Sequence, residues 1–330
     1  MTITKFPDFN EEFYLQVKEG LVPGHSVLHK YGRNPDIDTA SGFEAIWNGG
    51  GDYTGHDATV AETLEVFSSS ANDAGTLVSS GTATGGTSTT LVDSGATFVS
   101  DGVVAGDMAI NDTQQDHAFV TSLTETELTF LRMNEGAVTV STDAYRVVTT
   151  ASTGTSVVKL LNLKGDDFID TSEYIIMNGV TAVDTVGTYI RQDRARCYGL
   201  TNIGDITSRQ NVTVANVMMV LPIGYNSTMI AAYTVPAGKR AFVLTWNASA
   251  AKKTSFFSNV RLLFREVNGI FQVMEEFTVA TTGSSYVTRN YVAPKDSIPE
   301  KSDIKIMADS SVNDVGIAAG FDLIMVDDGV

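Results

Sequence analysis

The chain has few of the residues that build covalently linked or metal-held folds. Its 330 residues include a single cysteine, Cys197, and four histidines. One cysteine cannot form an intrachain disulfide, so packing alone must stabilise the fold. No apolar run approaches the ~20 residues that a membrane span requires, and the opening residues lack the basic and apolar regions of a secretory signal. We therefore expect no membrane partner and synthesis in a bacterial cytoplasm.

Basic residues are also scarce. The sequence has 22 Lys and Arg against 39 Asp and Glu, for a net charge of −17 at pH 7. Affinity for nucleic acid comes mainly from Lys and Arg that neutralise phosphates, and the first half of the chain offers few of them. We expect no nucleic-acid partner. The excess of carboxylates is compatible with a specific docking surface and equally with simple solubility.

Catalytic signatures are missing as well. The sequence has no Gly-x-Ser-x-Gly elbow and no phosphate-binding loop. His25 and His29 have the spacing of two metal ligands on one helix face, but Gly24 and Pro35 disfavour a helix there. Two arginines beside Cys197 could lower the pKa of its thiol, although a packed cysteine in a strand is the simpler interpretation. We expect no catalytic residue, no cofactor and no bound metal.

Short apolar runs separated by turn residues dominate the rest of the sequence. The pairs Asn178–Gly179 and Asn268–Gly269 stand between such runs and predict β-hairpins, because both turn positions favour positive φ. The other runs predict strands at Thr63–Phe67, Val157–Leu163, Tyr189–Tyr198, Ala241–Trp246, Val260–Val267, Asp303–Ala308 and Phe321–Val326. This pattern is typical of a mainly β protein with β-sandwich or jelly-roll-like domains.

The N-terminus predicts one short helix. Phe9, Phe13 and Val17 recur at helical spacing, Asp8 can cap the first turn, and Gly20 stands where the helix would end. A helix of this length is marginal alone in water, so we expect it to pack against its own domain or a neighbouring subunit.

The residues after this helix predict a loop. Asn34–Pro35 disfavours helix, and glycines punctuate the stretch 24–39. A second short helix, capped by Asp38 and running through Phe43 to Trp47, is expected before the Gly49–Gly51 break.

Residues 76–153 stand apart in composition. They open with a run of Gly, Thr and Ser, and residues 76–150 hold nine acidic side chains but only two basic ones. A segment of this length can form a small β domain. We interpret it as an inserted, acidic β module whose two ends lie close together. Its expected strands are Thr89–Asp93, Thr97–Val99, Asp107–Ile110, Ala118–Leu123 and Glu127–Leu131.

These observations divide the chain into three parts. Residues 1–75 plus 154–204 form an N-terminal helix, a loop and a discontinuous β domain. Residues 76–153 form the inserted β module, and residues 205–330 form a C-terminal β-sandwich.

Much of the chain outside the insert resembles a family of tailed-bacteriophage virion structural proteins. The stretches that carry the resemblance are His29–Thr39, Glu44–Gly51, Leu64–Asp73, Met177–Val183, Tyr233–Lys239 and Ala319–Asp328. The insert is similar to a small β module of phage structural proteins through Thr90–Phe98 and Val103–Asp107. The resemblance implies a virion component built from β domains.

The resemblance leaves two positions on the particle open. One is a capsid decoration or cement protein, a homotrimer that binds the major capsid protein on the outer head surface and stabilises the head. The alternative is a tail- or fibre-associated adhesin that recognises the host. A depolymerase enzyme is a third, weaker hypothesis. For a decoration protein, the expected docking residues are Phe9, Phe13, Val17, His29, Lys30, Arg33, Asn34, Asp36, Asp38 and Trp47.

Overall fold

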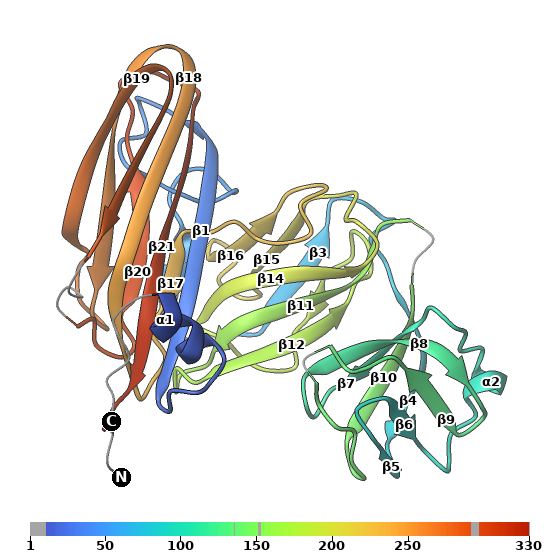
Figure 1. The fold of residues 1–330 in the computed structure, drawn as a ribbon. Helices are drawn as coiled ribbons and strands as arrows, with labels where there is room; N and C mark the ends of the chain where they lie inside the picture. Colours follow the sequence, from blue (N-terminus) through green and yellow to red (C-terminus); the bar gives the residue numbers. More distant parts are fainter. Residues whose placement is uncertain (1–10, 135, 151–152, 292–296, 330) are drawn as a thin grey trace. The chain divides into compact units, whose positions relative to one another are not determined.

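The computed structural model describes residues 11–134, 136–150, 153–291 and 297–329. Within these ranges the protein is mainly β, with sandwich-like sheets and two short α-helices, as the sequence predicts (Figure 1). Neither of these helices has the length and hydrophobicity of a membrane span. The chain divides into two compact units: Met1–His56, Asp167–Ile169 and Met229–Val330 in unit 1, and Asp57–Asp166 and Asp170–Thr228 in unit 2. These limits differ from those expected, since residues 1–56 belong with the C-terminal part of the chain.

Unit 1 is built on a seven-stranded antiparallel sheet. The strand order is β1-β21-β18-β20-β17, with β19 paired to β18 and β2 paired to β20. The strands are β1 (His25–Ile37), β2 (Glu44–Ala45), β17 (Ala232–Thr234), β18 (Lys239–Arg265), β19 (Gln272–Asn290), β20 (Asp303–Ala308) and β21 (Val315–Asp327).

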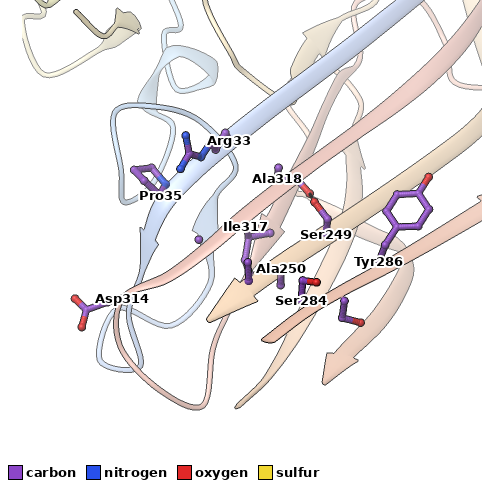
Figure 2. A pocket seen from close by; sticks show the side chains of 12 residues that line it. Arg33, Pro35, Ser249, Ala250, Ser284, Tyr286, Asp314, Ile317 and Ala318 are labelled. Carbon is purple, nitrogen blue, oxygen red and sulfur yellow. Dashed lines mark hydrogen bonds between the residues drawn. The ribbon is translucent and has the colours of Figure 1, made fainter. Parts of the chain in front are cut away.

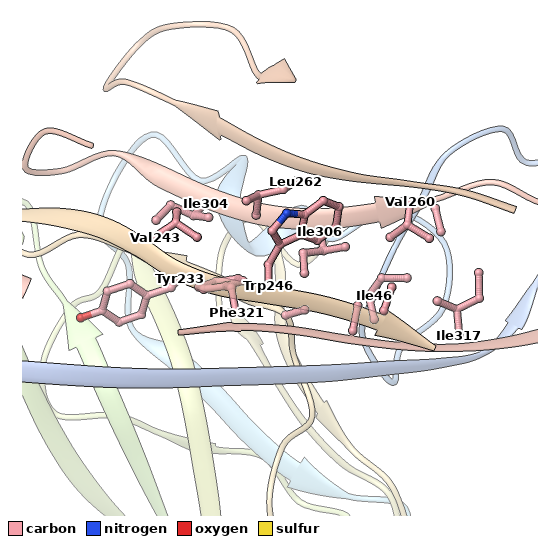
Figure 3. Packing of buried hydrophobic residues seen from close by; sticks show 14 of the residues in the cluster. Ile46, Tyr233, Val243, Trp246, Val260, Leu262, Ile304, Ile306, Ile317 and Phe321 are labelled. Carbon is pink, nitrogen blue, oxygen red and sulfur yellow. The ribbon is translucent and has the colours of Figure 1, made fainter. Parts of the chain in front are cut away.

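The strand β18 passes through both layers of this unit. Its first half pairs with β21 and its second half with β20, and its register against β19 shifts between Lys252 and Phe256. Side chains from the two halves, such as Trp246 and Leu262, meet in one apolar core (Figure 3). The sequence predicted two separate strands here. The polar residues between the two apolar runs hide the continuity, although Ala248, Ala250 and Phe256 among them are buried and the segment pairs with β21 as well as with β19.

Residues 24–39 correct a second expectation. They form the strand β1, not a loop, and pair antiparallel with β21 from His25 to Ile37. Asn34–Pro35 is tolerated because β1 lies at the edge of the sheet and its register shifts between Asn34 and Ile37. No helix follows at residues 38–47, where β2 lies instead, and the 3-10 turn η1 (Thr54–His56) comes after the glycine break.

The predicted N-terminal helix is confirmed as α1 (Glu11–Lys18). Val17 is buried against Leu244 and Ile324 of the sheet, and Phe13 packs beside it. Gly20 follows with φ +75°, a conformation that favours glycine at a helix end. Asp8 and Phe9 lie outside the described residues.

Unit 2 contains a three-stranded sheet, β12-β11-β14, and a four-stranded sheet, β13-β3-β15-β16. The strands are β3 (Leu64–Ser68), β11 (Thr155–Lys164), β12 (Asp170–Ile176), β13 (Val183–Asp184), β14 (Arg191–Gly199), β15 (Ile206–Gln210) and β16 (Val217–Leu221). The hairpin predicted at Asn178–Gly179 is wrong, because β12 pairs with β11 and β13 pairs with β3. Gly179 does adopt positive φ, but its turn leads from one sheet to the other. The hairpin at Asn268–Gly269 is confirmed by the β18–β19 pairing.

The inserted segment forms a sheet of its own within unit 2, in the order β4-β10-β7-β8-β9-β6-β5. Its elements are β4 (Thr76–Thr82), β5 (Gly85–Gly86), β6 (Thr90–Val92), α2 (Phe98–Asp101), β7 (Met108–Asn111), β8 (Asp116–Leu123), β9 (Glu127–Phe130) and β10 (Ala144–Thr149). The strand expected at Thr97–Val99 is therefore wrong, since Phe98 begins a helical turn that buries its ring. All other expected strands of the insert are present.

The buried residue Asp73 holds the two ends of the insert together. Its carboxylate accepts hydrogen bonds from Ser68 Oγ (2.6 Å), Thr155 N (2.9 Å), Ile203 N (3.1 Å) and Gly204 N (2.8 Å). A Cβ on Gly154 would lie 2.5 Å from Asn72 O, so only glycine fits this close approach. The expectation that the insert begins and ends at one place is confirmed.

Candidate functional site

The structure divides the predicted docking residues of β1 into two groups. Lys30 and Asn34 are buried, and Asn34 Nδ2 donates a hydrogen bond to Ala45 O at 3.1 Å. His29 and Arg33 alternate with them and are exposed on the outer face of the sheet. Only the second group can contact a partner, because successive side chains of a strand point to opposite faces.

Trp47 is also structural rather than exposed. Its side chain is buried, its indole Nε1 donates to Gly50 O at 2.9 Å, and its ring meets that of Tyr53 edge to face. Trp47 is therefore not available to dock a partner, contrary to the expectation from the sequence. Phe13 and Val17 are likewise occupied by packing of α1 on the sheet.

The exposed residues of β1 belong to rows that cross the sheet. His29 lies opposite Asp322 of β21, and Asp322 lies opposite Thr245 of β18. His29 Nδ1 is 2.5 Å from Asp322 Oδ1, and Thr245 Oγ1 donates to Asp322 Oδ2 at 2.8 Å. The carboxylate stands between the imidazole and the hydroxyl, so this row lacks the nucleophile–histidine contact of a catalytic triad.

Two rows further on, the outer face is hollowed. Arg33 lies opposite Ala318, Ala318 lies opposite Ser249, and Ser249 lies opposite Tyr286. Small side chains floor a hollow of about 690 Å³, with Arg33 and Pro35 at one side and Tyr286 at the other (Figure 2). Tyr286 is 64% exposed. Apolar faces of sugars and peptides can stack on such a ring.

Asp36 and Asp38 come together with Asp314 at the end of this hollow. Their carboxylate oxygens lie within 4.8 Å of one another, and the Asp314 amide donates to Asp38 Oδ1 at 3.1 Å. The negative charge of Asp38 raises the pKa of the Asp36 carboxyl, with smaller contributions from burial and from Asp314. Oxygen ligands of this kind suit a hard cation, but the cluster is largely solvent-exposed, where water competes for the ion.

A second hollow, of about 780 Å³, lies in unit 2 beside β12. Its carboxylates are already engaged: Asp112 pairs with Arg146, and Glu173 accepts bonds from Val186 N and from the Tyr189 hydroxyl. These contacts fix the walls of the hollow.

Cys197 does not have the environment of a reactive thiol. Burial raises its pKa to about 12, although a hydrogen bond with Thr155 acts in the opposite direction. The flanking Arg194 and Arg196 do not reverse this effect. The interpretation of Cys197 as a packed residue of β14 agrees with the structure.

The comparisons with known proteins add little to this description. No family model and no curated protein matches the chain. A structure of infectious bursal disease virus, Gx strain, has 8% sequence identity over 92% of this chain and 72% of that chain, with a TM-score of 0.20. The VP2 subviral particle of the same virus has 8% identity over 96% of this chain and 78% of that one, with a TM-score of 0.19. Likenesses at these scores carry no inference about fold or function.

Sequence reasoning missed Ser249, Tyr286 and Ala318, which line the hollow beside Arg33. These residues carry no motif, and only the register of β18 with its two neighbours brings them together. The one available signal was the resemblance at Ala319–Asp328, a stretch that lies directly against the His29 stretch in the sheet.

Proposed function

We propose that this protein is a non-catalytic structural component of a tailed-phage virion. In this proposal the protein decorates the capsid: a homotrimer binds the major capsid protein on the outer surface of the head and stabilises the head. The sequence resemblance supports this proposal. So does the way its stretches fit together, because the stretch from His29 and the stretch ending at Asp328 pair as β1 and β21.

The observation that carries the assembly role is the open edge formed by β19. Among the described strands, its one partner is β18, so the other side of its backbone is available along much of its 19 residues. An unpaired edge is a ready template for another chain, and proteins that remain monomeric protect it with charge or proline.

The composition of β19 favours a second copy of the same chain as its partner. Residues 277–288 contain no charged residue and no proline. In a chain of net charge −17, such a segment is where another copy can approach with the least repulsion. Arg289 Nε lies 3.6 Å from Glu275 Oε1, so β19 doubles back and presents two arms at one side of the sandwich. Closed symmetry lets these arms pair between subunits.

Two added charges on this edge test the proposal. Ala280→Lys with Ser284→Lys places cations on exposed positions of the two arms, and Val186→Lys, at an exposed site of unit 2, is the matched control. We expect native mass spectrometry to find a trimer for the parent chain and the control, and a monomer for the double variant. A parent chain that is monomeric at micromolar concentration contradicts the oligomer.

The place on the particle is tested separately. Quantitative mass spectrometry of purified virions is expected to find hundreds of copies, and the isolated protein is expected to bind heads that lack it. A few copies per particle, together with binding to host cells, would instead indicate that the protein is located on the tail. Absence from virions contradicts the virion assignment altogether.

One observation favours the adhesin as a second candidate. Tyr286 stands beside serines in the hollow of unit 1, and an exposed ring next to hydroxyls is a common surface for a sugar. On this alternative, Tyr286→Ala lowers binding to host cells while leaving the fold unchanged. Val186→Lys again provides the control.

A further inference from the structure

Unit 2 buries a lysine between two carboxylates at the end of β11. Lys164 Nζ lies 2.6 Å from Asp193 Oδ2 and 2.9 Å from Asp170 Oδ1, and it also donates to Asn162 O at 3.2 Å. The side chains of Lys164 and Asp193 are completely buried, while that of Asp170 is 35% exposed. The amine is thus held against one inaccessible carboxyl group and one that reaches solvent.

The backbone pairing of three strands fixes this arrangement. Lys164 is on the central strand β11, directly opposite Asp170 of β12 on one side and Arg191 of β14 on the other. Asp193 is two residues from Arg191 and therefore on the same face as Lys164. The Arg191 guanidinium is directed to the carbonyl oxygens of Ala58 and Ile190. The register of the sheet therefore places the Lys164 amine beside the Asp193 carboxyl group, and the contact does not depend on flexible surface side chains.

A buried ion pair of this kind is a weak source of stability by itself. The cost of removing both charges from water offsets most of their attraction, so an apolar pair of similar size is often as stable. Burial lowers the pKa of the Lys164 amine, and the charges of Asp193 and Asp170 outweigh this and raise it. The amine is therefore protonated at rest. It becomes neutral when one of its protons passes to the Asp193 carboxyl group, with which it is in contact.

From this geometry we infer that Lys164 and Asp193 become joined by an intramolecular isopeptide bond, with Asp170 as the proton carrier. The lone pair of Lys164 Nζ attacks Cγ of the protonated Asp193 carboxyl group. Asp170 accepts a proton from the nitrogen and delivers one to the departing hydroxyl. A C–N bond forms, a C–O bond breaks, and one water molecule leaves, without oxidant, reductant or co-reactant. Burial excludes water from the pair, and contact places the amine beside the carboxyl group that it attacks.

The cross-link would tie β11 to β14 across residues 165–192, a segment that contains β12 and β13. The three-stranded sheet could then not separate at this end, even when the rest of unit 2 opens. This consequence does not depend on where the protein is placed on a particle.

The mass of the full-length chain tests the inference directly. After denaturation, the purified protein is expected to weigh less than its sequence mass by one water molecule. Protease digestion is expected to release a branched peptide that links Lys164 to Asp193. A chain that keeps its full sequence mass after prolonged incubation at neutral and mildly acidic pH overturns the inference, and this readout is valid whether or not any variant folds.

Variants assign the missing water to this site. Lys164→Arg keeps the positive charge but removes the attacking primary amine, so it is expected to restore the full mass. Asp193→Ala is expected to do the same. Asp170→Asn should slow bond formation while leaving the parent residues in place, which identifies Asp170 as the proton carrier. A loss of water that persists in Lys164→Arg contradicts the assignment. Lys305, which pairs with the exposed Asp52 in unit 1, is the internal control and is expected to remain unmodified.

Discussion

The two units bury their polar residues in different places. In unit 1 the sandwich core is apolar: Ile304 and Ile306 of β20 point into it, while Asp303 and Lys305 of the same strand lie on the other side. In unit 2, charged groups connect segments that are distant in the sequence. Asp73 joins the start of the insert to Thr155 and to residues 203–204, all through its buried carboxylate.

The same contrast appears where the insert meets the rest of unit 2. His117 Nδ1 of the insert lies 2.9 Å from the Tyr174 hydroxyl of β12, and Lys159 Nζ of β11 donates to Gln115 O at 2.7 Å. Apolar contact also occurs there, between Met108 of the insert and Val157. Unit 1 has the larger apolar core, and its buried polar contacts, such as Arg265–Asp303 and Asn34–Ala45, lie outside that core. In unit 2, directional bonds fix where the insert and the neighbouring segments join.

The largest effect that follows from this contrast concerns Asp73. Asp73→Ala leaves a buried hydroxyl and three backbone amides, two of them buried, without their acceptor. We therefore expect a loss of about 3–5 kcal/mol in the free energy of unfolding. Hydrogen exchange should report lost protection around β11 and residues 203–204 and none in unit 1. Leu262→Ala, with a cost of about 2–5 kcal/mol, is the matched cavity variant in the other unit. If either variant lowers protection equally in both units, the difference proposed between polar bonding in unit 2 and apolar packing in unit 1 is contradicted.

The sequence alone predicts those strands of unit 1 that contain a run of apolar residues. Asp303–Ala308 is found as β20 with the same limits, and Phe321–Val326 lies within β21. It was not sufficient for β1. The strand alternates buried polar residues such as Asn34 with exposed ones, so hydrophobic periodicity is absent, and its burial depends on contacts with residues 45 and 231 that are distant in the sequence.

The candidate site shows the same limit. The exposed residues His29 and Arg33 could be proposed because they carry recognisable side chains. Tyr286 and Ser249 could not, since their position depends on the register of β18 with β19 and on the shift between Lys252 and Phe256. The turn at Asn178–Gly179 has the chemistry of a hairpin. The bond from the Gly179 amide to Asp73 O directs it to another sheet, and no local pattern encodes that bond.

A smaller effect is expected at the join between the insert and β12. Tyr174→Phe removes the hydroxyl that meets His117 and keeps the ring that packs beside Tyr198, so we expect a loss of about 1 kcal/mol. The change should increase hydrogen exchange in the strands of the insert nearest His117. Tyr225→Phe, at a more exposed tyrosine of unit 2, serves as the control. Unchanged exchange in the insert would mean that apolar packing alone holds the join.

The smallest effect concerns two carboxylates whose pKa values move in opposite directions. The pKa of Asp36 in unit 1 is raised, first by the charge of Asp38, so the ionised form is repelled in the folded protein. Asp36→Asn should therefore stabilise the protein slightly at neutral pH. This gain should disappear below pH 3.8, the ordinary pKa of the group, where Asp36 is protonated in both folded and unfolded chains.

Glu62 in unit 2 provides the opposite case. The Thr213 hydroxyl, at 2.6 Å, and the amides of Val212 and Thr213 bond to its carboxylate and lower its pKa. Its ionised form stabilises the folded state above pH 4.5, and this contribution is lost as the pH falls through the lowered pKa. Glu62→Gln should therefore destabilise the protein at neutral pH, where Asp36→Asn stabilises it. Thermal melts of both variants from pH 3 to pH 7, at about 0.1 M salt to limit long-range screening differences, compare the two signs directly. The same sign in both would mean that surface charge, rather than the local bonds of each unit, governs these positions.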